Sequence, residues 1–425
     1  MECFEIIGGK RLQGEYTLSG AKNGVLPILA AALLPEGESR ILDCPGLSDV
    51  AAMVQILEAL GCRAEREGRV LTLDPQALCC TEIPAELMKR MRSSVFLMGP
   101  LLARCGEVTL CCPGGCDIGC RPIDLHLEGL KKLGVEIREE GGLFRCRAAR
   151  MKGAEIRLPF PSVGATENLM MAALGAEGET LIRGAAREPE IVDLQHFLQK
   201  CGARVRGAGT SVIRVKGGRT QMAALRGTEH RVLPDRIEGG TYLAAAAATG
   251  GELLLQNACP DHMESFLQVL ETMGCRLLRS PDTVYIKAPG RLRPAAVRTG
   301  PHPGFPTDLQ SPLLTLMCLA EGESQLEETI FEARFRTAEE LAKMGAAVTV
   351  SEGRARIRGT GRLFGARVQA PDLRGGAALV VAGLAAEGKT IVENICHIDR
   401  GYDTLELGMG TLGAEMIRKG QNKKK

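Results

Sequence analysis

A thiol and a guanidinium that could act together lie five residues apart in a glycine-rich segment. Residues 113–126 read Pro-Gly-Gly-Cys-Asp-Ile-Gly-Cys-Arg-Pro-Ile-Asp-Leu-His, which places Cys116 after a Gly-Gly pair and Arg121 before Pro122. Glycine pairs allow tight turns, so we expect a loop with Cys116 near its tip. A positive charge favours the reactive thiolate and also attracts anions. The segment therefore predicts chemistry on an anionic substrate.

The cysteines of this segment allow two other interpretations. Cys112, Cys116 and Cys120 are spaced by four residues, with Cys111 and His126 nearby. Structural zinc sites usually have a second pair of closely spaced ligands, and none is evident here, so zinc is not favoured. A buried, inert thiol suits Cys111 and Cys112, beside a predicted strand, better than it suits Cys116.

Two further charged residues come at the start of apolar helices. Lys22, within 19–23, precedes the first such helix, whose free N–H groups could help it to hold an anion. A turn with a solvated lysine explains the pentapeptide equally well. Asp308 follows a proline-rich stretch, 301–306, and begins a later helix. It is either a helix cap or a base held rigidly beside a cleft.

Four arginines also lie next to apolar helices or after predicted strands: Arg92, Arg334, Arg374 and Arg400. A surface salt bridge is the simplest explanation for any one of them. Several that converge on one cleft would bind a substrate with more than one anionic group.

The elements that must position these residues recur six times. An apolar residue or cysteine followed by glycine precedes a strand-like run at intervals of 68 to 73 residues, with the glycines at Gly61, Gly134, Gly202, Gly274, Gly345 and Gly413. Each repeat begins with an apolar helix rich in small residues, at 23–34, 93–103, 166–176, 238–248, 309–320 and 376–386. A strand, an amphipathic helix that ends at the glycine, and closing strands complete it.

These repeats predict an α/β fold built from six βαβαββ units. The first helix of each unit is apolar on all sides, which favours an interior of helices surrounded by sheets over an open solenoid. Six equal units divide naturally into two groups of three. We therefore expect two lobes, with a ligand-binding cleft between them.

The composition narrows the classes of function. With 45% apolar and 24% charged residues the chain is globular, and its net charge of +2, 3% aromatic residues and lack of tryptophan argue against nucleic-acid binding. The longest apolar runs, such as 25–34, are too short to span a membrane, and residues 1–7 do not read as a signal peptide. Sixteen cysteines without such a signal suggest reduced thiols and a cytoplasmic protein.

Six blocks of the sequence, in this order, resemble the enolpyruvyl transferases, in particular those that act on a nucleotide sugar. The blocks are 18–23, 113–122, 186–193, 231–238, 301–308 and 397–402. The resemblance covers nearly the whole chain and implies a two-lobed, inside-out α/β barrel with three repeats in each lobe. It implies that one lobe is formed by 22–233 and the other by 1–21 together with 234–425.

The resemblance also implies an activity. Members of this kind transfer the enolpyruvyl group of phosphoenolpyruvate to the 3-hydroxyl of UDP-N-acetylglucosamine and release phosphate, the first committed step of peptidoglycan precursor synthesis and the step that fosfomycin blocks. The expected protein needs no metal or cofactor and acts as a monomer on small molecules, without nucleic acid or membrane. Two alternatives remain, a transferase acting on shikimate 3-phosphate and a weakly active paralogue that binds nucleotide sugar.

Roles for single residues follow from the same resemblance. Cys116 matches the acid that protonates phosphoenolpyruvate and can form an adduct with it, and Asp308 matches the residue that accepts the proton of the sugar hydroxyl. The residues that match phosphoenolpyruvate contacts are Lys22, Asn23, Arg121 and Arg400. Those that match nucleotide-sugar contacts are Arg92, Arg121, Pro122, Ile123, Asp124, Leu125, Ser162, Val163, Gly164 and Ile330. Those that match arginines assisting lobe closure are Arg334 and Arg374.

Three positions depart from the family pattern. Phe160 and Pro161 stand where many members have a lysine, so a contact to the diphosphate is expected to be lost. Ala333 replaces a common asparagine. Gly375 and Gly376 replace Ala-Ser, which is expected to loosen the start of that helix.

Overall fold

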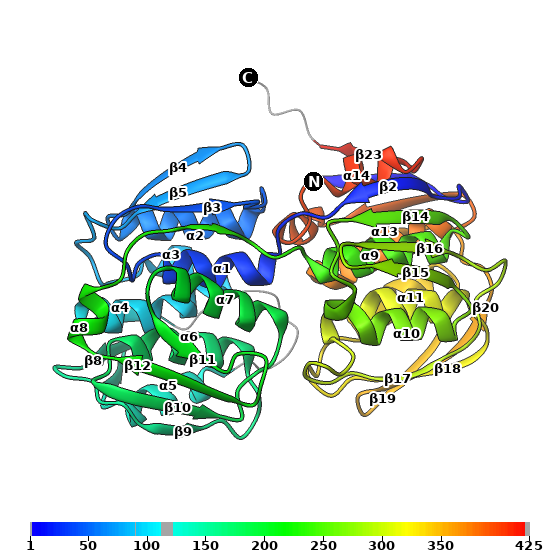
Figure 1. The fold of residues 1–425 in the computed structure, drawn as a ribbon. Coiled ribbons are helices and arrows are strands. Elements are labelled where there is room, and N and C mark those ends of the chain that lie inside the picture. Colours follow the sequence, from blue (N-terminus) through cyan, green and yellow to red (C-terminus); the bar gives the residue numbers. More distant parts are fainter. Residues whose placement is uncertain (1, 90, 112–121, 421–425) are drawn as a thin grey trace. The chain divides into compact units, whose positions relative to one another are not determined.

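The chain folds into two compact units, each described here by itself. The computed structural model describes residues 2–89, 91–111 and 122–420. The first unit contains described residues from 20 to 233, and the second contains residues up to 19 and from 234 onward, so the chain passes from one to the other twice (Figure 1).

The first unit alternates helices and short strands. Its helices are α1 (Lys22–Ala31), α2 (Ser48–Ala59), α3 (Ala85–Met88), η1 (Arg92–Leu97), α4 (Met98–Cys105), α5 (Asp124–Lys132), α6 (Val163–Leu174), α7 (Pro189–Lys200) and α8 (Arg219–Ala223). Its strands are β3 (Ser39–Leu42), β4 (Arg63–Glu67), β5 (Val70–Asp74), β6 (Glu107–Cys111), β7 (Glu136–Glu140), β8 (Leu143–Arg147), β9 (Glu155–Arg157), β10 (Gly178–Arg183), β11 (Arg204–Arg206), β12 (Val212–Gly217) and β13 (Glu229–Arg231).

The second unit repeats this alternation. Its helices are α9 (Arg236–Ala248), η2 (Pro260–Met263), α10 (Glu264–Thr272), η3 (Thr307–Leu309), α11 (Gln310–Leu319), α12 (Arg336–Lys343), α13 (Leu373–Ala385), η4 (Ile395–Arg400) and α14 (Leu405–Thr411). Its strands are β1 (Cys3–Ile7), β2 (Gln13–Thr17), β14 (Glu252–Gln256), β15 (Arg276–Ser280), β16 (Thr283–Lys287), β17 (Ala296–Arg298), β18 (Glu321–Glu327), β19 (Ala347–Ser351), β20 (Arg354–Thr360), β21 (Arg367–Gln369), β22 (Lys389–Glu393) and β23 (Glu415–Lys419).

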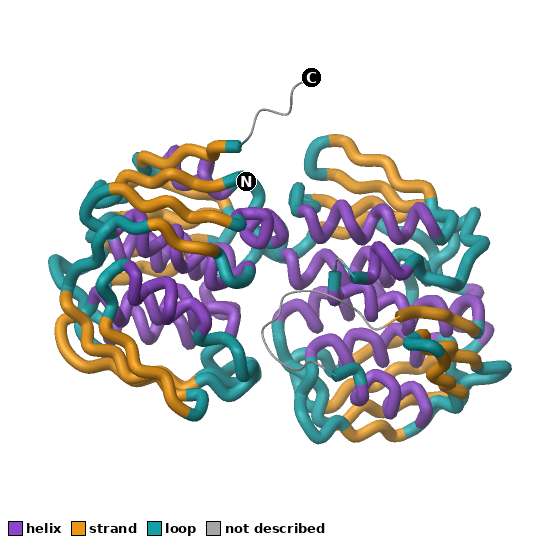
Figure 2. The backbone as a smooth tube through the Cα atoms, turned by 180° about the vertical axis from the view of Figure 1, so that it is seen from behind, coloured by secondary structure: helices purple, strands orange, loops and turns teal. Residues whose placement is uncertain are grey.

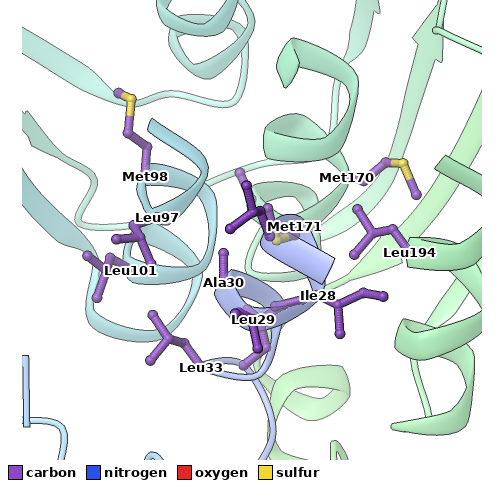
Figure 3. Packing of buried hydrophobic residues seen from close by; sticks show 14 of the residues in the cluster. Ile28, Leu29, Ala30, Leu33, Leu97, Met98, Leu101, Met170, Met171 and Leu194 are labelled. Atoms are coloured by element: carbon purple, nitrogen blue, oxygen red, sulfur yellow. The ribbon is translucent and has the colours of Figure 1, made fainter. Parts of the chain in front are cut away.

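Within each unit the apolar helices form the interior and the sheets lie outside (Figure 2). Every residue of α1 except Asn23 is buried, every residue of α11 is buried, and α6, α9 and α13 are buried to a similar extent. In the first unit, Ile28 of α1 and Leu33, just after the end of this helix, lie among Leu101 of α4, Met171 of α6 and Leu194 of α7 (Figure 3). This arrangement confirms the predicted α/β class with internal helices, because a helix that is apolar on all sides must be enclosed.

The described residues form six sheets, three in each unit. In the first unit the strand orders are β13-β3-β5-β4, β6-β8-β7 and β11-β12-β10-β9, and in the second β21-β22-β1-β23, β15-β16-β14-β2 and β17-β18-β20-β19. Five of the sheets contain one parallel pair, and the three-stranded sheet has a parallel bridge between Glu82 and Thr109 in its place. The sheets are therefore variants of one repeated unit.

The N-terminal segment completes two sheets of the second unit. β1 pairs with β22 and β23, and β2 pairs in parallel with β14 (Figure 1). These backbone hydrogen bonds explain why the first 19 residues belong with the C-terminal half of the chain.

The recurring glycine of the sequence ends the second helix of every repeat. All six glycines have φ between 90° and 103°, in the left-handed region. In the first repeat, Gly61 N donates to Glu58 O at 2.9 Å and Cys62 N to Leu57 O at 3.0 Å, and the other five repeats make the same pair of bonds. This is the Schellman motif, in which glycine avoids the strain that a Cβ would cause.

One titratable group in the first unit's core leads to a prediction about pH. Glu167 of α6 is 1% exposed, and neither carboxyl oxygen makes a hydrogen bond within the described residues. Burial, with smaller contributions from Glu190 and Glu188, raises the pKa of Glu167 well above 4.5. The folded protein therefore binds this proton more tightly than the unfolded chain does. The resulting stabilisation is complete below pH 4.5 and is lost as the pH rises toward the folded-state pKa.

Glu167→Gln, a neutral substitution of the same shape, is expected to raise the free energy of unfolding by a margin that grows with pH. Urea unfolding over a pH series from about 5 to 9 measures this margin, since unfolding linkage follows the difference in bound protons. Glu179→Gln, at an exposed position in the same unit, is the control. A margin that does not change with pH would show that Glu167 does not carry the buried proton.

Candidate active site

A buried cluster of charge in the second unit centres on Asp308. The two carboxylate oxygens of Asp308 face two guanidiniums: Oδ1 accepts a hydrogen bond from Arg334, and Oδ2 accepts one from Arg374 Nη2 at 3.4 Å. The arginine side chains are only 4% and 3% exposed, whereas that of Asp308 is 25% exposed. Asp308 is thus the solvent-facing member of a cluster whose cations are held inside.

Local structure explains these positions. Asp308 lies in η3, directly after a proline-rich segment whose rigid backbone leads into the helix. Arg334 lies two residues before the start of α12, and Arg374 lies in the first turn of α13. The start of α13 is capped by Asp372, whose Oδ1 accepts from Arg374 N at 2.9 Å and also lies 3.6 Å from Arg334 Nη1.

Neighbouring side chains hold both guanidiniums in place. Arg334 Nε donates to Thr307 Oγ1 at 3.3 Å, and Thr307 Oγ1 donates to Glu328 at 2.9 Å. Arg374 Nη1 donates to the Tyr402 hydroxyl at 3.3 Å, which in turn lies 2.8 Å from Thr241 Oγ1.

The charges of this cluster support one another. Burial opposes the charge of Arg374, but Asp308, Tyr402 and Asp235 together raise the pKa of its guanidinium above the ordinary value. The cluster can therefore present one carboxylate, in a fixed position, to a hydroxyl group.

Lys22 is the main charged group at the start of α1 in the first unit. It is the first residue of the helix, and its Nζ lies 2.9 Å from Asp49 Oδ2 in α2. The two side chains are 11% and 5% exposed, so the pair is largely shielded from water. Asn23 follows it and is half-buried.

Three helix starts come together elsewhere in the first unit. Arg92, at the start of η1, donates from Nη2 to Pro122 O at 3.4 Å, just before α5. A Cβ placed on Gly164, in the first turn of α6, would lie 3.4 Å from His126 Cε1 of α5. The structure thus brings together the predicted nucleotide-sugar contacts of this unit: Arg92, Pro122, Ile123, Asp124, Leu125, Ser162, Val163 and Gly164. Ser162 is the cap of α6 and accepts from Ala165 N at 3.3 Å.

His126 and Asn168 connect these helix starts. Burial, and to a lesser extent the charge of Arg92, lowers the pKa of His126 to about 4, so its ring is neutral near pH 7. Asn168 Nδ2 lies 3.0 Å from His126 Nδ1 and 3.2 Å from Val95 O, while its Oδ1 accepts from Gly99 N at 2.6 Å. One amide therefore bridges α5, α6 and the η1–α4 segment.

The other predicted residues lie as follows. Ile330, half-buried in the second unit, donates from its backbone N to Glu328 at 2.7 Å. Arg400 ends η4, which packs against α13. Cys116 and Arg121 lie outside the described residues, as do Cys112 and Cys120, so their assigned roles stay predictions. The described part of the chain contains no group of three His, Cys, Asp or Glu side chains arranged to hold a metal ion.

The expectation that Gly375 and Gly376 loosen the start of α13 is wrong. Asp372 caps this helix, and both glycines are tightly packed. A Cβ on Gly375 would lie 2.5 Å from Thr337 Oγ1, and one on Gly376 would lie 2.7 Å from Ile398 Cγ1. The glycines allow close approach of neighbouring segments instead. Of the other departures, Phe160 is 44% exposed and Ala333 is half-buried.

Reasoning from the sequence missed several residues that contact the predicted site residues, among them Asp49, Glu328, Asp372 and Tyr402. Asp49 and Asp372 are at helix starts, where an aspartate reads as an ordinary cap. Tyr402 is the last residue of the block 397–402, which also contains Arg400. This closeness in the sequence was the only signal that Tyr402 could contact the site. Among the described helices, none is long and apolar enough to cross a membrane.

Comparison with known proteins agrees with these features. The family model described as EPSP synthase (3-phosphoshikimate 1-carboxyvinyltransferase) matches residues 6–408. The chain is 52% identical over 421 residues to UDP-N-acetylglucosamine 1-carboxyvinyltransferase 2 of Caldanaerobacter subterraneus subsp. tengcongensis, covering 98% of this chain and 100% of the relative. It is 51% identical over 423 residues to UDP-N-acetylglucosamine 1-carboxyvinyltransferase 1 of Symbiobacterium thermophilum, covering 98% of this chain and 95% of the relative.

Solved structures share the fold. The enolpyruvyl transferase NikO from Streptomyces tendae superposes with a TM-score of 0.88 at 26% identity, covering 98% of this chain and 99% of that one. An EPSP synthase from Acinetobacter baumannii has a TM-score of 0.77 at 20% identity, covering 99% of this chain and 100% of that one, and shows likeness of fold alone. The match along the whole chain, together with the repeats, shows that the protein belongs to the enolpyruvyl transferase family, among the UDP-N-acetylglucosamine 1-carboxyvinyltransferases.

Proposed function

We propose that the protein transfers the enolpyruvyl group of phosphoenolpyruvate to the 3-hydroxyl of UDP-N-acetylglucosamine and releases phosphate. This reaction is the first committed step of peptidoglycan precursor synthesis. The observation that carries the proposal is the identity of 52% to a relative of that name over essentially the full length of both chains. The Asp308 cluster and the Lys22 pair add side chains suited to a hydroxyl and to an anion.

In this mechanism Cys116 protonates the methylene carbon of phosphoenolpyruvate, and the adjacent carbon becomes cationic. The sugar 3-oxygen adds to that carbon and gives up its proton, and phosphate then leaves from the tetrahedral intermediate as a proton is lost from the new methyl group. Lys22, Arg121 and Arg400 bind the carboxylate and phosphate of phosphoenolpyruvate and stabilise the charge that develops. No metal or cofactor takes part.

Asp308 is proposed to orient the sugar hydroxyl and accept its proton. The transfer is expected as the oxygen bonds to the cationic carbon and becomes more acidic. The proposed nucleotide-sugar contacts are Arg92, Arg121–Leu125, Ser162, Val163, Gly164 and Ile330. Arg334 and Arg374 are proposed to assist closure of two lobes, 22–233 and 1–21 with 234–425.

The proposed setting is the cytoplasm, and the proposed active form is a monomer. In this role the protein would support cell-wall growth and cell division, and it would be a target of fosfomycin. These statements depend on the proposed reaction and not on any separate feature of the chain.

An assay of phosphate release tests the proposal against its two alternatives. We expect release from phosphoenolpyruvate when UDP-N-acetylglucosamine is supplied and none when shikimate 3-phosphate is supplied. Release with shikimate 3-phosphate alone would reassign the substrate, since the EPSP synthase family model also matches this chain. If neither acceptor led to phosphate release, the remaining alternative would be a protein that only binds the nucleotide sugar.

A further inference from the structure

We propose that Asp49 is a positioning residue that holds Lys22 in place for phosphoenolpyruvate. The inference rests on the proposed function, in which Lys22 binds that substrate. It adds a residue that lies outside the sequence blocks that indicated the family.

The first step of the argument concerns the unfavourable position of Lys22. Lys22 is the first residue of α1, and the first turn of this helix contains no acidic side chain. Free N–H groups give a helix N-terminus a partial positive charge, which disfavours an ammonium group there. The residue as a whole is only 9% exposed, so water does little to offset this repulsion. The compensating negative charge must come from another element.

Asp49 supplies this charge from a favourable position. It lies in the first turn of α2, where a helix N-terminus stabilises a carboxylate, and it is 3% exposed. α1 and α2 pack against each other within the first unit, and the two charged atoms are 2.9 Å apart. The N-terminus of α2 therefore stabilises the carboxylate of Asp49, and this carboxylate keeps Lys22 charged and oriented at the start of α1.

The consequence concerns binding of an anion. A buried ammonium without its partner would bear a large desolvation cost and would leave its position. With Asp49 present, Lys22 meets phosphoenolpyruvate already charged and ordered, so less ordering remains at the moment of reaction. Asp49 itself is a poor contact for the substrate, because both carry negative charge.

The test compares Asp49→Asn, Asp49→Glu, Lys22→Ala and the double variant Lys22→Ala/Asp49→Asn. We expect Asp49→Asn to lower kcat/KM for phosphoenolpyruvate by about 10²-fold, because displacing a positioned group by about 1 Å can cause a loss of this size. The KM for UDP-N-acetylglucosamine should stay unchanged. Asp49→Glu keeps the charge and should restore much of the activity. In the Lys22→Ala background the Asp49→Asn change should have no further effect, because the two residues act as one unit.

A matched control is Glu229→Gln, which removes an exposed ion pair with Arg40 in the same unit and should leave both constants unchanged. A normal kcat/KM for phosphoenolpyruvate in Asp49→Asn, together with a strongly lowered value in Lys22→Ala, would overturn the role of Asp49 without affecting that of Lys22. An additive loss in the double variant would also overturn it. If Asp49→Asn does not fold, Asp49→Glu decides, because an equal rise of both KM values there would contradict specific positioning. Failure of the proposed function can be distinguished from failure of the Asp49 proposal, because the unsubstituted protein itself would then release no phosphate with UDP-N-acetylglucosamine.

Discussion

Replacing Cys116 by serine is expected to lower turnover of phosphoenolpyruvate and UDP-N-acetylglucosamine by about 10²- to 10⁴-fold, the range that general acid catalysis contributes. A thiol has an ordinary pKa of about 8.5, whereas a serine hydroxyl is far too weak an acid to protonate carbon near pH 7. Steady-state phosphate release measures the loss. Unchanged turnover in Cys116→Ser would remove Cys116 from the mechanism.

A second measurement on the same residue uses an epoxide of the fosfomycin type. We expect it to label Cys116 in preference to the other fifteen cysteines, and faster when the nucleotide sugar is bound. Burial raises the pKa of six thiols to about 11 or 12, so they carry almost no reactive thiolate: Cys44, Cys62, Cys146, Cys201, Cys275 and Cys318.

Among the described cysteines, the exposed Cys79, Cys105 and Cys396 are the competitors to control for, and replacing each of them by serine should leave the labelling of the protein unchanged. Peptide mass spectrometry identifies the modified residue. Labelling spread over several cysteines would contradict a special reactivity of Cys116.

The second large effect is expected from Asp308→Ala. This substitution removes the carboxylate that faces Arg334 and Arg374, and it leaves two nearly buried guanidiniums side by side. Removing one partner of a buried ion pair typically costs about 3–5 kcal/mol, because the remaining charge is not compensated. We therefore expect the free energy of unfolding of the second unit to fall by about this amount. Denaturant unfolding followed by circular dichroism measures it, and turnover should be lost as well.

Glu5→Ala is the matched control for this prediction. Glu5 also lies between two cations of the second unit, 2.9 Å from Lys389 and 2.7 Å from Lys419, but these lysines are about half exposed. Water solvates them when the carboxylate is removed, so the loss should be clearly smaller than for Asp308→Ala. Equal losses in the two variants would show that burial of the arginines does not govern the effect.

The repeats, the element types and the glycine that ends the second helix of each repeat could be predicted because they depend on neighbouring residues. A helix that is apolar on all sides must be buried wherever it packs, as α1 and α13 are. Glycine at Gly61 and its five counterparts ends a helix because the left-handed conformation is accessible to it without strain. Element boundaries differ from the structure by a few residues, as expected where helix ends are decided by capping bonds.

The contacts of the candidate site could not be predicted in the same way. Asp308 meets Arg334 across 26 residues and Arg374 across 66, and Lys22 meets Asp49 from a different helix. Each of these residues has an ordinary local explanation, as a cap or a surface charge, which the sequence cannot distinguish from a buried ion pair. The difference is solvent exposure, and exposure depends on how the repeats pack.

By itself the sequence determined the kind of protein: an α/β chain of six related units whose charged residues suit an anionic substrate and a hydroxyl acceptor. Short-range backbone and side-chain preferences are sufficient to identify this kind of protein, because the same preferences recur in each of the six units. Only the tertiary structure decided which charges are paired, since the packing of α1 on α2, and the approach of Asp308 to Arg334 and Arg374, remove water from those pairs. The removal of water determines both the attraction within an ion pair and the cost of burying its charges. No local sequence pattern indicates whether a charged residue loses its water in this way.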